Sequence, residues 1–345
     1  MAQTLQNTLY LLTPGLSVHR DGLALRIDQE HQLKLSLPIH NLESVFVFGA
    51  DIYLSPAVLR LCWEHGASVC FFTDWGRLEA VVDGVPRGSV MLRRAQHRAA
   101  DTLATTAAIA RSFVAGKLHN TRWLLSRSAR DAAAEEDSSA LRTVTDNLAY
   151  LLRELERTPD DLDIIRGVEG RAAALHFEVF ARHLRPSLRP QFPFDGRNRR
   201  PPRDALNCLL SFLYALLRHD CTSALTAVGL DPFVGFLHAD RSGRESLALD
   251  LMEEFRPWVE RIALTLVNRG ELKLAHFVVR DGGAVELTEA ARKLLVAAYQ
   301  QRKAEEIAHP LFREKVRYAQ LAFIQARLLA RALRDGAAYE PHLFT

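Results

Sequence analysis

The sequence predicts an α+β protein, in which a small N-terminal β domain is followed by a larger, mostly α-helical domain. Short apolar or alternating runs fill about the first eighty residues, whereas Ala, Leu and Arg at helical spacing dominate from Asp101 onward. A chain of 345 residues is also long enough for two domains with substantial cores. We therefore place the β domain at residues 1–86, a linker at 87–100 and the helical domain at 101–345.

Strand and turn signals alternate through residues 1–86. The expected strands are Asn7–Leu12, Gln32–Leu37, Glu43–Phe48, Ser68–Thr73 and Leu78–Val82, with a hairpin turn at Asp21-Gly22. One helix interrupts them, because Ser55 can cap its start, Pro56 suits its first position and Gly66 can end it. Asp83-Gly84 and Pro86 mark the end of the domain.

The larger domain departs from helical spacing in three places. Gly229–His238 shows a strand-like pattern. Leu274–Val279 and Ala284–Leu287 flank Gly282-Gly283 as in a hairpin, and Thr288 can cap the helix that follows. Arg182–Arg203 holds five prolines and no helical period, so we expect a loop that exposes its arginines.

Composition excludes several classes of protein. The chain is 48% hydrophobic and 25% charged, which is typical of a globular protein and not of a disordered or fibrous one. Its longest nearly apolar stretch, Cys208–Leu217, is far shorter than the ~20 residues of a membrane-spanning helix. Met1–Ser17 lacks the basic start of a secretory signal, and the four cysteines form no C-x-x-C pair. We therefore expect a cytoplasmic protein with no membrane association.

Charge is distributed unevenly, although 44 Lys and Arg against 41 Asp and Glu give a net charge of only +3. Residues 87–130 hold eight arginines and Lys117 against one acid, residues 182–203 hold seven arginines against one acid, and residues 135–163 are acidic. This segregation favours a surface that binds a polyanion. The alternative is that each run is a solvated helix face.

Motifs for several common chemistries are absent. The chain has no G-x-x-x-x-G-K-[ST], no G-x-G-x-x-G after a strand, no H-E-x-x-H and no G-x-S-x-G. ATP hydrolysis, dinucleotide chemistry and serine hydrolysis therefore lose support. A few acidic residues and one histidine in unusual positions remain as candidates.

Glu169 is the first candidate. It lies between Gly167 and Gly170 and is followed by three alanines, so another backbone or a phosphate can approach it closely. The alternative is a glutamate on a helix surface that pairs with Arg166 or Arg171.

The other candidates lie in two segments further along the chain. His238 stands where an apolar run enters a polar loop, and can be either a ligand or a structural residue. Asp250 and Glu253 project from a shared face of a helix over Ser246–Pro257, whereas Glu254 is expected to face solvent. A partly buried pair of carboxylates needs a cation. Carboxylates with one imidazole suit Mg²⁺ or Mn²⁺ better than a structural zinc ion.

A divalent ion beside arginine-rich segments suggests phosphodiester chemistry. Such an ion would polarise a phosphate oxygen and orient a water or a sugar hydroxyl for in-line attack. Arginines would hold a DNA backbone through bidentate phosphate contacts that read little sequence. The expected DNA contacts are Arg197, Arg199 and Arg200 of the loop, and Arg241, Arg244 and Arg256 around the ion site.

Four motifs, in order, resemble the universal CRISPR-associated integrase of spacer acquisition. They are Gly167-Val168-Glu169-Gly170, Arg200–Tyr214, Gly235-Phe236-Leu237-His238 and Ser246–Pro257. Asn7–Leu12 and the hairpin Gly282–Leu287 leading into Lys293–Arg302 also look like this family, so the resemblance covers essentially the whole chain. Tyr339-Glu340-Pro341 suggests its subtype I-C branch.

The resemblance implies an N-terminal β-sandwich with dimer contacts, a helical catalytic domain, a homodimer and a small ferredoxin-like CRISPR adaptation partner protein. It implies a metal-dependent DNA endonuclease and integrase, which inserts captured DNA fragments as new spacers by 3′-hydroxyl attack on the CRISPR repeat. Glu169, His238 and Glu253 would be its metal ligands, and Asp250 would be a nearby carboxylate that shares the ion or orients it. Two other functions stay open, a non-catalytic DNA-binding scaffold and a non-specific metal-dependent nuclease.

Overall fold

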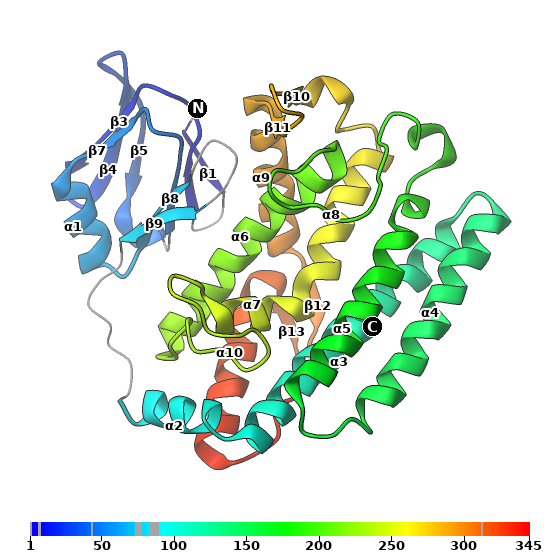
Figure 1. Cartoon of the computed structure of the whole chain (residues 1–345). Helices are drawn as coiled ribbons and strands as arrows, with labels where there is room; N and C mark the ends of the chain where they lie inside the picture. Colours follow the sequence, from blue (N-terminus) through cyan, green and yellow to red (C-terminus); the bar gives the residue numbers. More distant parts are fainter. Residues whose placement is uncertain (1, 6–7, 43, 73–77, 83–89, 312) are drawn as a thin grey trace. The chain divides into compact units, whose positions relative to one another are not determined.

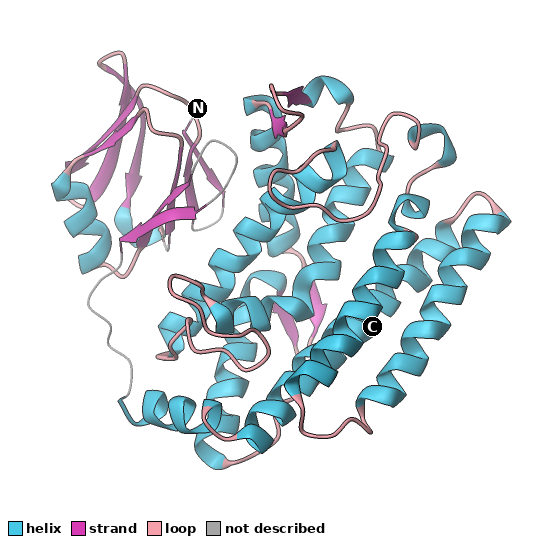
Figure 2. Cartoon of the chain, in the orientation of Figure 1, coloured by secondary structure: helices cyan, strands magenta, loops and turns pink. Residues whose placement is uncertain are grey.

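The computed structural model describes residues 2–5, 8–42, 44–72, 78–82, 90–311 and 313–345 (Figure 1). The chain divides into two compact units. The first consists of Met1–Pro86, His276–Val278 and Glu286–Ala304, and the second of Arg87–Ala275, Val279–Val285 and Glu305–Thr345. The predicted α+β class, with strands first and helices after them, is confirmed (Figure 2). Some predicted positions lie outside the described residues, namely Asn7, Glu43, Thr73, Asp83-Gly84 and Pro86.

Two mixed sheets and one helix build the N-terminal part of the first unit. One sheet has the order β1-β2-β6-β8-β9, with β1 (Ala2–Leu5), β2 (Thr8–Leu11), β6 (Ser44–Phe48), β8 (Ser68–Phe72) and β9 (Leu78–Val82). The other has the order β5-β4-β3-β7, with β3 (Leu16–Asp21), β4 (Ala24–Gln29), β5 (Gln32–Pro38) and β7 (Ile52–Leu54). Side chains from both sheets and from α1 (Pro56–Glu64) share one core, which includes Leu9, Val45, Val18, Ile27 and Leu61. The predicted strands, the turn at Asp21-Gly22 and the helix are thus confirmed within the described residues.

A small hairpin and α9 (Glu289–Ala304) lie further along the chain. The strands of this hairpin are β10 (Phe277–Val279) and β11 (Val285–Leu287), and they pair as predicted. The hydroxyl of Thr288 accepts a hydrogen bond from the backbone N–H of Ala291 at 3.2 Å, so it caps α9. A second hairpin, β12 (Glu306–Ala308) with β13 (Lys315–Arg317), was not expected from the sequence.

Helices dominate the second unit (Figure 2). They are α2 (Val90–Ala100), α3 (Leu103–Asp131), α4 (Glu135–Leu155), α5 (Leu162–Glu178), α6 (Ala205–Val228), α7 (Ser246–Met252), α8 (Arg256–Asn268) and α10 (Tyr318–Asp335). Short 3₁₀ turns elsewhere in the chain are η1 (Ile39–Asn41), η2 (Phe180–His183), η3 (Pro186–Leu188), η4 (Glu253–Phe255) and η5 (Leu274–His276). Among the described residues, no helix combines the length and the apolar character needed to cross a membrane.

The core of the second unit forms where α3, α4 and α5 pack together. Buried residues of α4, such as Leu141, Val144 and Leu148, recur three or four positions apart, which places them on one face of the helix. Leu118 of α3 and Ile165 of α5 lie in the same core. Since Lys117 and Glu169 are near neighbours of these two residues in sequence, the packing also fixes the helices that carry polar groups.

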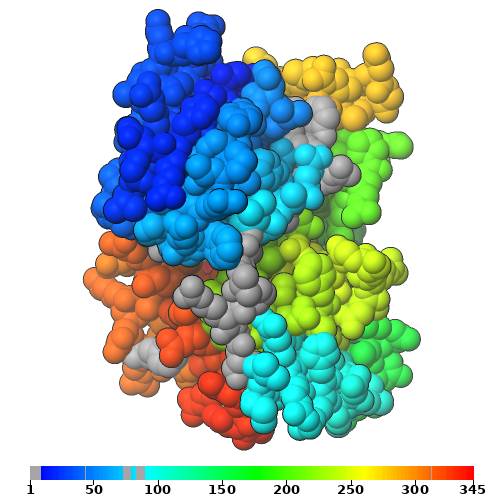
Figure 3. Space-filling view, turned by 90° about the vertical axis from the view of Figure 1, so that its left-hand side faces the viewer, coloured from blue at the N-terminus to red at the C-terminus, as the bar shows by residue number. Residues whose placement is uncertain are grey.

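Two predictions about local structure are wrong. Residues 90–100 lie in the segment predicted to be a linker, but they form α2. Gln96 of α2 donates hydrogen bonds to the carbonyls of Asp231 and Val234, and Figure 3 shows α2 in cyan beside this yellow-green loop. Gly229–His238 is an irregular loop and not a strand, because Asp250 accepts several of its backbone N–H groups. The expected loop at 182–203 is confirmed, apart from short 3₁₀ turns.

Candidate active site

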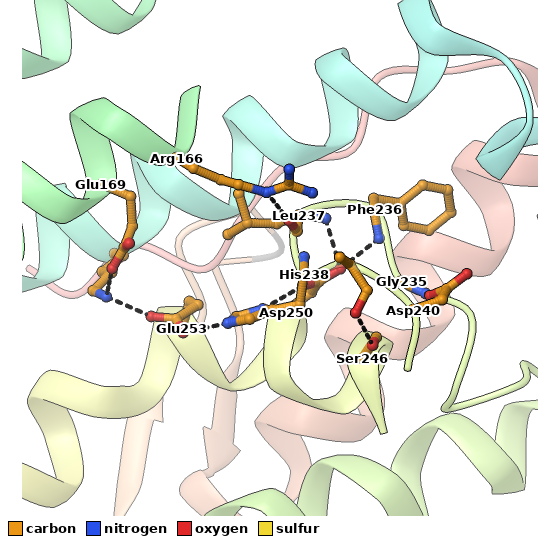
Figure 4. A network of polar contacts seen from close by, with 12 residues as sticks. Arg166, Glu169, Gly235, Phe236, Leu237, His238, Asp240, Ser246, Asp250 and Glu253 are labelled. Carbon is orange, nitrogen blue, oxygen red and sulfur yellow. Dashed lines mark hydrogen bonds and ion pairs between the residues drawn. The ribbon is translucent and has the colours of Figure 1, made fainter. Parts of the chain in front are cut away.

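The four predicted acidic and histidine site residues come from four elements of the second unit. Glu169 lies on α5, His238 lies on the loop after α6, Asp250 lies on α7, and Glu253 begins η4. Figure 4 shows these four side chains in one network of polar contacts. The fold therefore brings together residues that are up to 84 positions apart in the sequence, the separation of Glu169 and Glu253.

Asp250 is fully buried and organises the loop that carries His238. Its carboxylate accepts hydrogen bonds from the backbone N–H groups of Phe236, Leu237 and His238, at 2.6, 3.0 and 2.9 Å. A side chain at Gly235 would not fit, because a Cβ there would lie 3.0 Å from Oδ2 of Asp250 and 2.7 Å from Cβ of a neighbouring serine. The loop therefore wraps closely around one carboxylate.

Asp250 also sets the orientation of the His238 ring. Nδ1 of His238 lies 2.7 Å from Oδ1 of Asp250, so we assign the ring proton to Nδ1 from this contact. The other ring nitrogen, Nε2, lies 3.8 Å from Oε1 of Glu253, and it can offer a lone pair when the ring is neutral. The contact with Asp250 thus fixes the imidazole with Nε2 toward Glu253.

Glu253 is an ionised carboxylate held between two cations. Only 3% of its side chain is exposed, and its oxygens lie 2.7 Å from Nζ of Lys117 and 2.8 Å from a guanidinium nitrogen of Arg256. Burial acts to raise the pKa of Glu253, but Arg256 and Lys117 outweigh it and lower the pKa to about 2. The group is therefore negatively charged at neutral pH.

Lys117 of α3 joins the two glutamates. Its ammonium contacts the carboxylate of Glu169 as well as that of Glu253. Burial acts to lower the pKa of Lys117, but the attraction of Glu253 and Glu169 outweighs this and raises it, so the side chain stays charged. The sequence did not identify this residue, although one signal was present. Lys117 is the only lysine between Lys34 and Lys273.

The alternative prediction for Glu169, a pair with Arg166 or Arg171, is wrong. Arg166 pairs with Asp163 at 2.9 Å and donates a 2.7 Å hydrogen bond to the carbonyl of Leu237, while Arg171 pairs with Glu154. Arg166 thereby ties α5 to the loop that carries His238 (Figure 4). Glu169 itself points into the network through Lys117.

The prediction that Glu254 faces solvent is also wrong. The side chain is completely buried, and burial raises its pKa to about 8. The prediction assumed one continuous α-helix over Ser246–Pro257, but the helix tightens into η4 at Glu253, which changes the direction of the side chains that follow.

The predicted arginine contacts differ in their surroundings. Arg256 is buried, pairs with Glu253 and lies 4.7 Å from the centre of the Tyr214 ring. Arg197 donates to Asn207 at 2.6 Å and to a serine hydroxyl at 3.2 Å. These two guanidinium groups therefore bind within the protein. The other four are more accessible, with Arg199, Arg200 and Arg241 exposed and Arg244 half-buried.

A small cavity and a wider groove adjoin the network. The cavity has a volume of about 40 Å³ and is lined by Lys117, Glu169 and Arg256, among others. The groove has a volume of about 660 Å³ and runs beside α5, where it is lined by Phe177 and Arg199, among others. Since Phe177 and Arg199 line both spaces, the groove adjoins the cavity that Glu169 lines.

The side chains at this site are of the types that bind a divalent ion. In this structure Lys117 lies between the carboxylates of Glu169 and Glu253 and sets the distance between them. Two carboxylates and an imidazole with a free Nε2 lone pair are ligands suited to Mg²⁺ or Mn²⁺. Across the described part of the chain, no group of three or more His, Cys, Asp or Glu side chains is spaced to hold a metal ion as it stands. The ammonium of Lys117 supplies positive charge between Glu169 and Glu253.

Comparison with known proteins connects this arrangement to a family. Residues 9–301 match the family model of the CRISPR associated protein Cas1. The chain is 47% identical over 342 residues to the CRISPR-associated endonuclease Cas1 1 of Moorella thermoacetica, with 99% of each chain covered. It is 44% identical over 342 residues to the CRISPR-associated endonuclease Cas1 2 of Rhodospirillum rubrum, with 98% of each chain covered.

Solved structures show the same fold. A casposase bound to its integration product matches with a TM-score of 0.83 at 21% identity, covering 97% of this chain and 92% of the casposase. A Cas1 protein from Thermotoga maritima matches with a TM-score of 0.80 at 23% identity, covering 98% of this chain and 99% of that protein. The family match, the two relatives and the shared fold agree with the resemblance seen in the four motifs. The chain belongs to the Cas1 family of CRISPR-associated proteins.

Proposed function

We propose that this chain is a divalent-metal-dependent DNA endonuclease and integrase that inserts captured DNA fragments into a CRISPR array as new spacers. The observation that carries the proposal is the convergence of Glu169, the Nε2 side of His238 and ionised Glu253 around one buried charge network. The names of the relatives, CRISPR-associated endonucleases, support a nuclease. The likeness to a casposase bound to its integration product supports strand transfer.

In this proposal, Glu169, His238 and Glu253 hold Mg²⁺ or Mn²⁺, and Asp250 orients His238 without binding the ion. When bound, the ion supplies Lewis-acid activation of a phosphate oxygen. Asp250 keeps the proton of His238 on Nδ1, and its own oxygens already accept three backbone N–H groups. Arg256 keeps Glu253 ionised and in place.

The groove beside α5 is the proposed path of the reacting DNA strand. Arg199 stands where the groove meets the cavity, so its guanidinium can bind a phosphate next to the carboxylates. Arg200, Arg241 and Arg244 are the other proposed DNA contacts, with little sequence reading. Arg197 and Arg256 act indirectly in this scheme, because both are engaged inside the protein.

The proposed partners are double-stranded DNA, a second copy of the chain and a small ferredoxin-like adaptation protein in the cytoplasm. A Cas6-RT-Cas1–Cas2 complex contains a chain of which 36% is covered by this one, with a TM-score of 0.81 at 22% identity. Assembly with a Cas2 protein in that complex supports a similar partner here.

A plasmid integration assay tests the function. We expect Glu169→Ala, His238→Ala and Glu253→Ala each to abolish strand transfer while the protein stays folded. Activity that persists in any two of them contradicts the proposal. Sequencing of the products separates joined DNA from DNA that was only cut, and so distinguishes an integrase from a non-specific nuclease.

Metal titration separates the enzyme from a DNA-binding scaffold. Mn²⁺ should raise the melting temperature of the wild type but not of Glu169→Ala, because an ion that binds only the native state stabilises it. A scaffold with no metal site would show the same melting temperature with and without Mn²⁺ in both proteins.

A further inference from the structure

Glu254 connects the candidate active site to a segment near the other end of the sequence. Its carboxyl oxygens are hydrogen-bonded to the hydroxyl of Tyr339, to Nε2 of Gln325 at 3.1 Å and to the backbone N–H of His342 at 2.7 Å. Both oxygens are thereby bonded to groups on α10 or on the segment that follows it. We call Tyr339–Phe344 the C-terminal segment.

Asn120 makes a second connection between the same parts. Its amide nitrogen donates to the carbonyls of Glu254 and His342, at 2.7 and 2.8 Å. Its amide oxygen accepts a 2.8 Å hydrogen bond from the backbone N–H of Phe344. Asn120 is completely buried and lies on α3, one helical turn after Lys117. One side chain thus links α3, η4 and the C-terminal segment.

Packing brings the C-terminal segment against the backbone of α3. A Cβ at Gly116 would lie 2.8 Å from Cβ of Pro341 and 3.2 Å from Cγ of Glu254, so only glycine fits there without a shift. The ring of Tyr339 packs on Phe113 with 5.0 Å between the ring centres. The contact surface therefore lies directly beside Lys117.

We propose that the C-terminal segment is a structural part of the active site and that Glu254 is the positioning residue that couples them. The segment contacts both elements that supply the central ion pair, α3 with Lys117 and η4 with Glu253. A 3₁₀ turn of three residues has little rigidity of its own, so its neighbours set its position. This inference rests on the proposed function for the role of Glu253, and Glu254 itself touches no reacting atom.

The test compares Glu254→Ala with Glu254→Gln in the full chain. Alanine removes the acceptor for three donors, whereas glutamine keeps the size, accepts from His342 and offers an amide to Tyr339. We expect Glu254→Ala to lower the strand-transfer rate at saturating DNA by about 10-fold to 100-fold, because small misplacements of catalytic groups have effects of this size. DNA affinity should change little, and Glu254→Gln should restore the rate.

Two further measurements separate positioning from general damage. Hydrogen exchange should show faster exchange at the amides of His342 and Phe344 in Glu254→Ala but not in Glu254→Gln. Mn²⁺ affinity, measured by electron paramagnetic resonance, should fall by about 10-fold in Glu254→Ala, as expected when the support of a metal ligand is lost. If Glu254→Ala does not fold, Tyr339→Phe carries the test, with Tyr150→Phe as its control because Tyr150 is 62% exposed.

The outcomes distinguish this inference from the proposed function. The inference is overturned if His342 and Phe344 lose protection while strand transfer and Mn²⁺ affinity stay at wild-type values. It is supported if all three change together and glutamine restores them. If Glu253→Ala and His238→Ala leave Mn²⁺ binding and strand transfer unchanged, the proposed function fails instead, whatever the exchange of the segment shows.

Discussion

Two adjacent glutamates of η4, Glu253 and Glu254, lie in opposite electrostatic surroundings. Glu253 faces the cations of Lys117 and Arg256, which lower its pKa to about 2. Glu254 faces the neutral donors of Tyr339, Gln325 and a backbone amide, and burial raises its pKa to about 8. At pH 7 one carboxyl is charged and the other is protonated. Burial alone therefore does not decide the charge of a carboxyl group, because the charge of its neighbours does.

The sharpest way to test this contrast is to make one substitution on each side. Glu253→Gln removes a charge that Lys117 and Arg256 balance, so we expect strand transfer to fall by at least about 100-fold. Glu254→Gln replaces a neutral carboxyl with a neutral amide, so we expect a rate within about 3-fold of the wild type. A plasmid integration assay under one set of conditions measures both, and equal losses in the two variants would contradict the contrast.

Removal of Lys117, the cation that Glu169 and Glu253 share, should destabilise the folded protein. Lys117→Met leaves Glu169 and Glu253 without their common partner, and we expect a loss of about 4 kcal/mol in the free energy of unfolding in the presence of a chelator. Mn²⁺ should recover much of this loss, because it supplies positive charge at the same carboxylates. Urea unfolding with and without Mn²⁺ measures both effects. Lys34→Met, at an exposed position in the first unit, is the control.

Glu254, the neutral carboxyl group, should make the stability of the protein depend on pH. The native pKa of Glu254, about 8, lies above its ordinary value of 4.5, so its contribution to stability is fully present below pH 4.5 and is lost as pH rises through about 8. Glu254→Gln lacks this loss. Relative to the wild type, it should gain about 3 kcal/mol between pH 4.5 and pH 7. Thermal unfolding over this range would refute the assignment if the two curves stayed parallel.

His342, whose backbone N–H binds Glu254, provides a test with a smaller expected effect, because its contribution to stability is lost as pH falls. Both of its ring nitrogens are buried without a hydrogen-bond partner in the described structure, and burial lowers its pKa from 6.5 to about 3. Its contribution to stability is therefore fully present above pH 6.5 and is lost as pH falls through about 3. Between pH 7 and pH 5 the wild type should lose about 2 kcal/mol more than His342→Phe. Exposed His40, changed to Phe, should leave the slope of the wild type unchanged.

Much of the fold followed from the sequence because its signals are local. The apolar run of β6 and the Ser55-Pro56 start of α1 depend on residues within one element, and so does the spacing of Leu141, Val144 and Leu148 in α4. Gly229–His238 was misread because its apolar residues resemble a strand, whereas its N–H groups bond to a carboxylate twelve or more positions later. Because Asp250 lies so far along the chain, the local pattern of apolar residues does not indicate that it is the acceptor.

The candidate site was predictable in part for the same reason. Glu169 stood out through its flanking glycines and His238 through its place at the end of an apolar run. Lys117 and Glu254 did not stand out, since their partners come from distant helices and from the C-terminal segment. The switch from α-helix to 3₁₀ turn at Glu253 is likewise decided by tertiary packing, which a helical wheel does not include.

The hydrogen bond from Asn120 to His342 joins residues that are 222 positions apart. During synthesis such a bond cannot form until His342 has left the ribosome, so α3 and η4 lack the contacts of the C-terminal segment up to that point. If that segment completes the active site, a partly made chain on the ribosome has no finished centre for cutting DNA.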